Sequence, residues 1–392
     1  SHLIEKNTSS IKSNLDINYK ELINYLTKVF NKNEFDNISR LNLIQAKLEY
    51  SNILLNYYKN EESELLLIEG MKLSKTQINM IGKLGVRTKY QQIKYPQLEM
   101  EILRDKNYSN IDINSENISS DSNPCNIQLD SISDNILYEN PNLDDSTETL
   151  LLNMDCLIIL SILQNKIKSN AFSDAVKMEA QTLLTSILKN EQAWSLKMYS
   201  LIKRSEIEFN NNKKMDRAML QYDQIIEDWN SKKSSLINRT MYIFTINFPS
   251  IIQINSTIAS NYKSIRSFAT AANLYKNVGL YEEAISCFLL SQRAEEAENL
   301  FELMDEHELE SPKVYCLKGD IYKDIKYYEK ALLISHNKYP RAFRSLGRYY
   351  YNIKDNEKSL INYLKAVEIN DYNKESWQMI GYIYYINKDY QL

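Results

Sequence analysis

The sequence predicts an all-α protein in which a helical N-terminal part precedes a right-handed α–α superhelix. Glycine and proline are scarce, with 7 Gly and 6 Pro in 392 residues. Sheet-rich folds need both residues in tight turns, whereas helix interiors exclude them. The composition, 43% hydrophobic and 25% charged, suits a chain that buries a core. In addition, one residue pattern recurs at helical spacing in the last third of the chain.

The N-terminal and central parts show the apolar periodicity of amphipathic helices without a visible repeat. We expect a helical region over residues 1–105, a loop over 106–149, a central helical region over 150–250 and the superhelix over 251–392. The last repeat stops before its second helix, so we expect the superhelix to be truncated there. The expected helices before the superhelix cover residues 19–30, 41–58, 64–81, 90–104, 153–167, 173–189, 192–209 and 216–229.

The segment 106–149 differs from the rest of the chain in composition. Between Asn107 and Glu148 it contains nine acids and no Lys or Arg, and Asn, Ser and Asp dominate it. Such a segment cannot bury enough apolar surface to offset its chain entropy. We therefore predict a disordered, acidic low-complexity loop, either a tolerated insertion or an interaction segment that could fold onto a basic surface of the same chain.

The pattern in the last third is an aromatic residue, a small residue four positions later and Tyr three positions after that. These offsets place the three side chains on one stripe of a helix. The instances are Phe268/Ala272/Tyr275, Tyr315/Gly319/Tyr322, Phe343/Gly347/Tyr350 and Trp377/Gly381/Tyr384. A repeat of this kind predicts helical hairpins that stack into a solenoid, because each hairpin exposes an apolar face until the next one covers it.

A second regularity follows twelve residues after three of the small residues. It pairs Ala272 with Ala284, Gly319 with Ala331, and Gly347 with Ser359. Small side chains at both positions let two antiparallel helices approach closely. Pro312 and Pro340 indicate helix starts, and residues 293–304 are expected to form an extra helix between the first two repeats.

This phasing resembles the tetratricopeptide repeat. Beyond the repeat, residues 84–91 (LGVRTKYQ) resemble an L-G-K-R-T-K/R-F-Q signature of the tetratricopeptide repeat protein 27 family, with Val86 in place of a basic residue. Further similar stretches are residues 194–205, 215–218, 314–320, 328–331 and 341–348. The resemblance covers about residues 60–392. It implies a non-enzymatic helical-repeat scaffold or assembly factor, associated with chaperone networks and ribonucleoprotein assembly. The four cysteines show no paired spacing, so we expect a reducing compartment, the cytoplasm or nucleus.

The sequence contains none of the catalytic or cofactor motifs that we sought. Its three histidines are scattered, and it has no phosphate-binding loop, dinucleotide fingerprint or nucleophile elbow. Cys287 and Cys316 are expected to be small core residues. We therefore expect neither an enzyme nor a bound cofactor or metal. No apolar stretch approaches the length of a membrane helix.

The positive functional signal is a basic stripe. Arg341, Arg344 and Arg348 share a helix face that is separate from the stripe of Phe343, Gly347 and Tyr350. In this repeat that face points into the concave groove, and equivalent positions of neighbouring repeats include Lys313, Lys323 and Tyr382. Since Arg makes bidentate contacts with carboxylates and phosphates, we predict a groove for an acidic or phosphorylated protein segment. The alternative is a solvated face, or pairing within the chain with acids such as Asp320.

Two other modes of binding are weighed against this interpretation. The carboxylate clamp that grips chaperone C-termini needs Lys and Asn, but the corresponding positions carry Cys316, Asp320, Ser345, Glu375 and Met379. Direct clamp binding is therefore not expected. An RNA-binding helical repeat is the alternative function, but a net charge of −4 argues against it, because nucleic-acid affinity comes largely from phosphate neutralisation.

Overall fold

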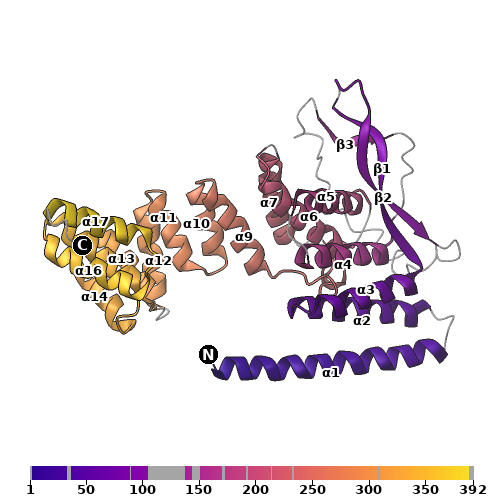
Figure 1. Cartoon of the computed structure of the whole chain (residues 1–392), viewed down its shortest axis with the longest axis horizontal. Coiled ribbons are helices and arrows are strands. Elements are labelled where there is room, and N and C mark those ends of the chain that lie inside the picture. Colours follow the sequence, from indigo (N-terminus) through magenta and orange to yellow (C-terminus); the bar gives the residue numbers. More distant parts are fainter. Residues whose placement is uncertain are drawn as a thin grey trace. The chain divides into compact units, whose positions relative to one another are not determined.

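The computed structural model describes residues 2–32, 37–88, 90–104, 137–143, 151–169, 173–190, 193–212, 214–231, 234–306 and 310–387. About 75% of the described residues are helical, and their 17 helices pack in consecutive pairs (Figure 1). The predicted helical fold is confirmed. The chain divides into two compact units, unit 1 over Ser1–Pro249 and unit 2 over Ser250–Leu392.

Unit 1 contains the first eight helices and the strands. Its elements are α1 (His2–Lys32), α2 (Asn37–Asn56), α3 (Asn60–Ser74), β1 (Thr76–Thr88), β2 (Tyr95–Arg104), β3 (Leu137–Leu143), α4 (Asn153–Ser169), α5 (Asp174–Leu188), α6 (Trp194–Phe209), α7 (Met215–Ser231) and α8 (Leu236–Thr240). Seven of the eight helices predicted from apolar periodicity thus have a counterpart, although the one expected over 64–81 ends at Ser74.

The core of unit 1 surrounds α4. The run from Cys156 to Leu160 is fully buried, at 0% exposure for every residue. Leu183, Leu184 and Ile187 of α5 pack into the same cluster, together with residues of α2, α6 and β2. This apolar run of α4 is therefore the centre of a core. Within the described ranges, none of the helices has the length and hydropathy that a bilayer crossing requires.

The strands are where the structure departs from the predicted helices. β1 pairs with both β2 and β3 in an antiparallel sheet of order β2-β1-β3. Ile78 lies opposite Ile102, and Met80 opposite Met100. All four side chains pack into or against the core of unit 1, so every second residue faces it, which is the period of a strand. The helix predicted over 90–104, and the end of the one predicted over 64–81, are therefore wrong.

Most of the predicted acidic loop lies outside the described residues. Of the segment 106–149, the structure describes only 137–143, which form β3 against β1. For those seven residues a strand replaces the predicted disordered loop, because β1 offers them its second edge.

Unit 2 consists of helices in its described residues. They are α9 (Ile251–Ser264), α10 (Phe268–Asn277), α11 (Tyr281–Leu290), α12 (Ala294–Glu306), α13 (Pro312–Tyr322), α14 (Ile325–Ile334), α15 (Pro340–Asn352), α16 (Asn356–Ile369) and α17 (Lys374–Asn387). The predicted hairpins correspond to α10–α11, α13–α14 and α15–α16, and the predicted extra helix is α12. Both prolines stand at the first turn of their helices, and the Ser311 side chain caps α13 by accepting from the Val314 N–H.

Candidate functional site

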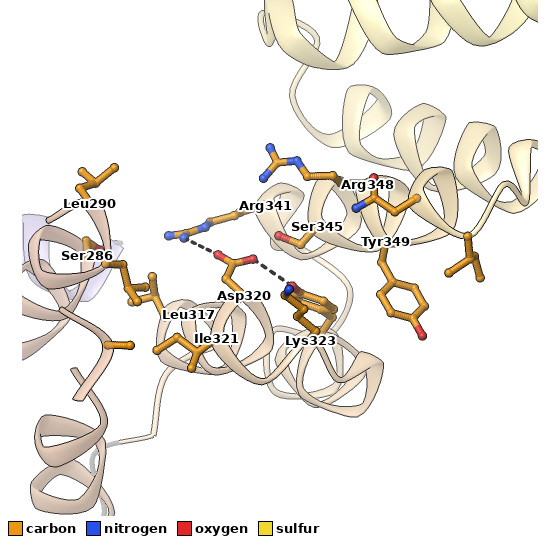
Figure 2. Close-up of a pocket in the computed structure, with 15 residues that line it drawn as sticks. Ser286, Leu290, Leu317, Asp320, Ile321, Lys323, Arg341, Ser345, Arg348 and Tyr349 are labelled. Carbon is orange, nitrogen blue, oxygen red and sulfur yellow. Dashed lines mark hydrogen bonds and ion pairs between the residues drawn. The ribbon is translucent and has the colours of Figure 1, made fainter. Parts of the chain in front are cut away.

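A groove of about 860 Å³ lies between helices of unit 2. α11, α13 and α15 supply most of its lining, and Figure 2 shows charged and apolar side chains from these helices around one space. We refer to it as the α11–α15 groove. Its lining residues are Ser286, Leu289, Leu290, Ala294, Leu317, Asp320, Ile321, Lys323, Tyr328, Arg341, Ser345, Arg348, Tyr349, Asn352 and Ile353.

Close helix packing positions α13 and α15 at this groove. A Cβ built on Gly319 would lie 2.5 Å from the ring of Tyr328, and one on Gly347 would lie 2.8 Å from the ring of Tyr363. Each glycine therefore lets an aromatic ring of the paired helix rest on its backbone. The Ser359 hydroxyl also donates a hydrogen bond to the Gly347 carbonyl at 2.8 Å. These contacts hold the two helices of each hairpin close together.

Apolar side chains form much of the groove surface. Leu317 and Ile321 stand one turn apart on α13, and Leu290 and Ile353 are each 55% exposed. Exposed aliphatic side chains gathered around one depression can receive an apolar side chain of a partner. Sequence reasoning missed this part of the site. The signal was present, because Leu289 and Leu290 follow the buried Phe288 at the end of α11, outside the buried stripe.

Arg341 pairs with a carboxylate of its own chain. Its Nη2 lies 3.3 Å from Asp320 Oδ2 (Figure 2). The Tyr328 hydroxyl donates to Asp320 Oδ1 at 2.9 Å. Burial and the negative charge of Asp320 raise the pKa of Tyr328, which keeps this phenol protonated as a donor. The pairing foreseen as the alternative for this stripe is therefore present at Arg341.

The other two arginines differ from each other. Arg348 lines the groove and its Nη2 is hydrogen bonded to Glu375 Oε1, with both side chains about half exposed. Arg344 is not among the lining residues and has no hydrogen bond or ion pair with any residue that the structure describes. The stripe thus carries one guanidinium that no described carboxylate neutralises.

Of the three remaining predicted residues, one lines the α11–α15 groove and two lie outside it. Lys323 lines the groove at the C-terminal end of α13. Lys313 does not line it, and forms ion pairs with Glu283 and Glu282 of α11 instead. Tyr382 is half exposed on α17, where its ring meets that of Tyr351 edge-on at 6.2 Å. The structure therefore brings Lys323, Arg341 and Arg348 together in the α11–α15 groove, with Arg344 beside them on α15.

The cysteine next to the stripe is unreactive. Cys316 is fully buried, and burial raises the pKa of its thiol to about 12. A thiol with so high a pKa carries almost no thiolate at neutral pH. Among the residues that the structure describes, no group of three or more His, Cys, Asp or Glu could hold a metal ion.

Comparison with known proteins gives a repeat family and a set of relatives. The tetratricopeptide repeat family model matches residues 312–333, which span α13 and nearly all of α14. The tetratricopeptide repeat protein 27 homolog of Dictyostelium discoideum is 25% identical over 345 residues, which cover 86% of this chain and 40% of that protein. Over most of its length the chain is therefore similar, at low sequence identity, to proteins of the tetratricopeptide repeat protein 27 family.

Two further relatives also match most of this chain and less than half of their own length. Essential for maintenance of the cell wall protein 1 of Saccharomyces cerevisiae is 28% identical over 278 residues, covering 66% of this chain and 30% of that protein. Tetratricopeptide repeat-containing protein trd-1 of Caenorhabditis elegans is 20% identical over 345 residues, covering 86% and 44%. The chain thus spans less than half the length of these relatives. The resemblance stated from sequence is confirmed, and tetratricopeptide repeat proteins are generally non-catalytic, protein-binding scaffolds.

Proposed function

We propose that this chain is a non-enzymatic scaffold whose α11–α15 groove binds an acidic or phosphorylated segment of a partner protein. The observation that carries the proposal is the placement of Lys323, Arg341 and Arg348 around an apolar surface, with Asp320 as the one acid among the lining residues. Arginine recognises carboxylates and phosphates in bidentate geometry. An apolar side chain of the same segment would rest on Ile321 and the half-exposed Leu290 and Ile353.

Arg344 strengthens this proposal. Arg341 and Arg348 are balanced by Asp320 and Glu375, so a partner acid must displace an internal acid to reach them. Arg344 has no such competitor among the described residues, and it stands between the other two on α15. A carboxylate or phosphate that reaches past the groove lining to Arg344 therefore has no internal acid to displace.

The wider role is part of the same proposal. The family resemblance favours an assembly factor that works with chaperones on ribonucleoprotein components, and the unpaired cysteine spacing favours the cytoplasm or nucleus. Such a role needs a surface that binds a protein segment without catalysing a reaction on it. The groove, with its partly exposed aliphatic and guanidinium groups, supports a binding surface of this kind.

Site-specific photo-crosslinking in an extract of the source organism tests the proposal. A photoreactive residue replaces Ile353, which is exposed at the groove. The matched control replaces Leu333, which is 75% exposed on α14 and does not line the groove. We expect one protein to be crosslinked from position 353 and not from 333, and Arg344→Glu to reduce its yield at unchanged helicity.

Two results would contradict the proposal. One is equal crosslinking from both positions, and the other is a yield that Arg344→Glu and Arg348→Glu leave unchanged. Recovery of RNA rather than protein from position 353 would favour the alternative of an RNA-binding helical repeat. Calorimetry with a chaperone C-terminal peptide should show no heat, because the clamp positions include the buried Cys316 and the acid Glu375.

A further inference from the structure

A second pocket lies in unit 1, independent of the α11–α15 groove. Its volume is about 330 Å³, and it is lined by residues of α4 and α6 together with Asn210, which follows α6. We call it the α4–α6 pocket. Leu163, Ile167 and Ile207 give it apolar walls. The volume is at the lower end of small-molecule sites, which are about 300–1,000 Å³. The stretch 194–205 that resembles the family supplies two of the polar residues lining it, Tyr199 and Lys203.

Two cationic side chains from different helices line this pocket. Lys168 comes from α4 and Lys203 from α6, and Glu206 is the one acid among the lining residues. Lys203 Nζ lies 2.8 Å from Glu206 Oε2. Desolvation lowers the pKa of Lys168, and the positive charge of Lys203 lowers it further. Lys168 Nζ is also hydrogen bonded to Asn56 Oδ1 of α2. The two like charges repel each other, and an anion bound in the pocket would relieve that repulsion.

A buried hydroxyl adds a directed donor. Tyr199 is 3% exposed and is among the lining residues, and its hydroxyl oxygen accepts a hydrogen bond from Gln164 Nε2 at 2.7 Å. No hydrogen bond donated by the Tyr199 hydroxyl to a described residue is present. The second acceptor of the Gln164 amide group is the Ile246 carbonyl, so Gln164 Nε2 is fully used. The phenolic proton is therefore not committed to an acceptor among the described residues.

We propose that the α4–α6 pocket binds the carboxylate of a small acid with a compact apolar body, held by Lys168, Lys203 and the Tyr199 hydroxyl. The charge balance selects a monoanion, because two lysines against Glu206 leave one positive charge. A phosphate dianion would exceed that charge and face Glu206. The aliphatic walls favour a branched hydrocarbon next to the carboxylate.

Calorimetry and ligand-observed NMR on the full chain test the assignment with 4-methylpentanoate as the probe. We expect saturable binding at millimolar concentration. Lys203→Gln removes one cation and leaves Glu206 unpaired, so binding should weaken by roughly tenfold or more. Lys168→Gln, at the exposed rim, is the second variant, and it should weaken binding without disturbing the fold. Lys177→Gln on α5 and Arg348→Glu in the α11–α15 groove are controls that should leave binding unchanged.

A series of ligands tests whether the bound carboxylate belongs to a free acid or to the C-terminus of a peptide. The neutral 4-methylpentanamide should not bind, and inorganic phosphate should bind more weakly than the carboxylate. A peptide with a C-terminal leucine carries the same group on a longer body. Tighter binding of that peptide would identify the carboxylate as a chain terminus, and weaker binding would identify a free acid. Absence of saturable 4-methylpentanoate binding, equal binding of the amide, or unchanged binding in both lysine variants would overturn the assignment.

Discussion

The glycines of unit 2 are not equivalent, although the same sequence pattern contains three of them. A Cβ on Gly319 or Gly347 would lie less than 3 Å from an aromatic ring, whereas one on Gly381 would have nothing within 4 Å. The pattern identifies where a small residue stands in each repeat. Only the packing of the following helix decides whether that residue has to be small.

Alanine substitution separates these cases. Gly319→Ala and Gly347→Ala should each destabilise unit 2 by about 1–3 kcal/mol, because the added methyl group forces a tyrosine ring away. Gly381→Ala is the matched control, and it should stabilise α17 by about 0.5–1 kcal/mol, since alanine favours helix. Urea unfolding of the three variants measures the difference. Equal effects at all three positions would show that Tyr328 and Tyr363 do not pack on these glycines.

Glu208 is a buried charge in unit 1. It is 1% exposed, accepts a hydrogen bond from Arg217 Nε at 2.9 Å, and is also contacted by the Gln221 amide. Glu208→Leu leaves the partly buried Arg217 without its acid, and should destabilise unit 1 by about 3–5 kcal/mol. Glu227→Leu, at an exposed position of α7, is the control and should change little. We expect Glu208→Leu to lose cooperative unfolding and Glu227→Leu to keep it. Circular dichroism measured during unfolding tests this expectation.

At the scale of elements, one carboxylate ties three helices of unit 2 together. Glu283 of α11 lies 3.5 Å from Lys263 Nζ of α9 and is hydrogen bonded by Lys313 of α13. Burial alone would raise the pKa of Glu283, but the hydrogen bond and charge of Lys313, joined by Lys263, bring it below its ordinary value of 4.5. A depressed carboxyl pKa stabilises the fold above the unfolded-state pKa.

This linkage gives a pH dependence with a definite sign. Glu283→Gln should lower the melting temperature of unit 2 at neutral pH, and the difference from the natural chain should shrink as the pH falls below 4.5. Protonation of Glu283 in the natural chain removes the same interactions as the substitution. Glu329→Gln, an exposed acid on α14, is the control. A difference that persists undiminished in acid would contradict the role of these ion pairs.

The β-hairpin shows what periodicity could and could not predict. Between Gln97 and Ile102, polar and apolar residues alternate strictly, which is the period of a strand. The helical prediction there followed the character of the whole chain rather than this local signal. The hairpins of unit 2 were predictable because the aromatic, small and Tyr positions repeat. A pattern that occurs four times is stronger evidence for a structure than the periodicity of a single segment.

Neighbouring residues on β2 test the strand directly. Ile102 is 8% exposed and faces the core, and Leu103, the next residue, is 49% exposed on the other face. Ile102→Asp should destabilise unit 1 by several kcal/mol, because it buries an unpaired charge. Leu103→Asp should be nearly neutral. Chemical denaturation of both variants checks the expectation, and a comparable loss at both positions would contradict the strand.

The candidate groove was only partly predictable, because the sequence gives the spacing of residues along one helix but not the contacts between repeats. The helix stripe placed the three arginines on one face, because that depends only on spacing along α15. The acids that balance Arg341 and Arg348 come from α13 and α17, at sequence separations of 21 and 27 residues. Asp320 was foreseen as a possible partner and Glu375 was not. Contacts across repeats depend on how far each hairpin turns against the next, which one sequence does not specify.

At the scale of the whole molecule, the chain divides into two compact units at residue 250. Unit 2 begins with the capping box of α9, in which Ser250 and Gln253 exchange hydrogen bonds. Residues 250–392 should therefore fold alone, with the helical circular dichroism and cooperative unfolding expected of stacked hairpins. A fragment over 265–392, which lacks α9 and its buried Ile258 and Tyr262, should be less stable. A disordered 250–392 fragment would contradict the division.

The rings that rest on Gly319 and Gly347 restrict how these repeats can diverge. Each glycine and its tyrosine fill one volume between two helices, so a side chain gained at the first position requires a smaller residue at the second. Independent drift at either place opens the hairpin or leaves a void. Sequences descended from a common ancestor should accordingly change Gly347 and Tyr363 in concert.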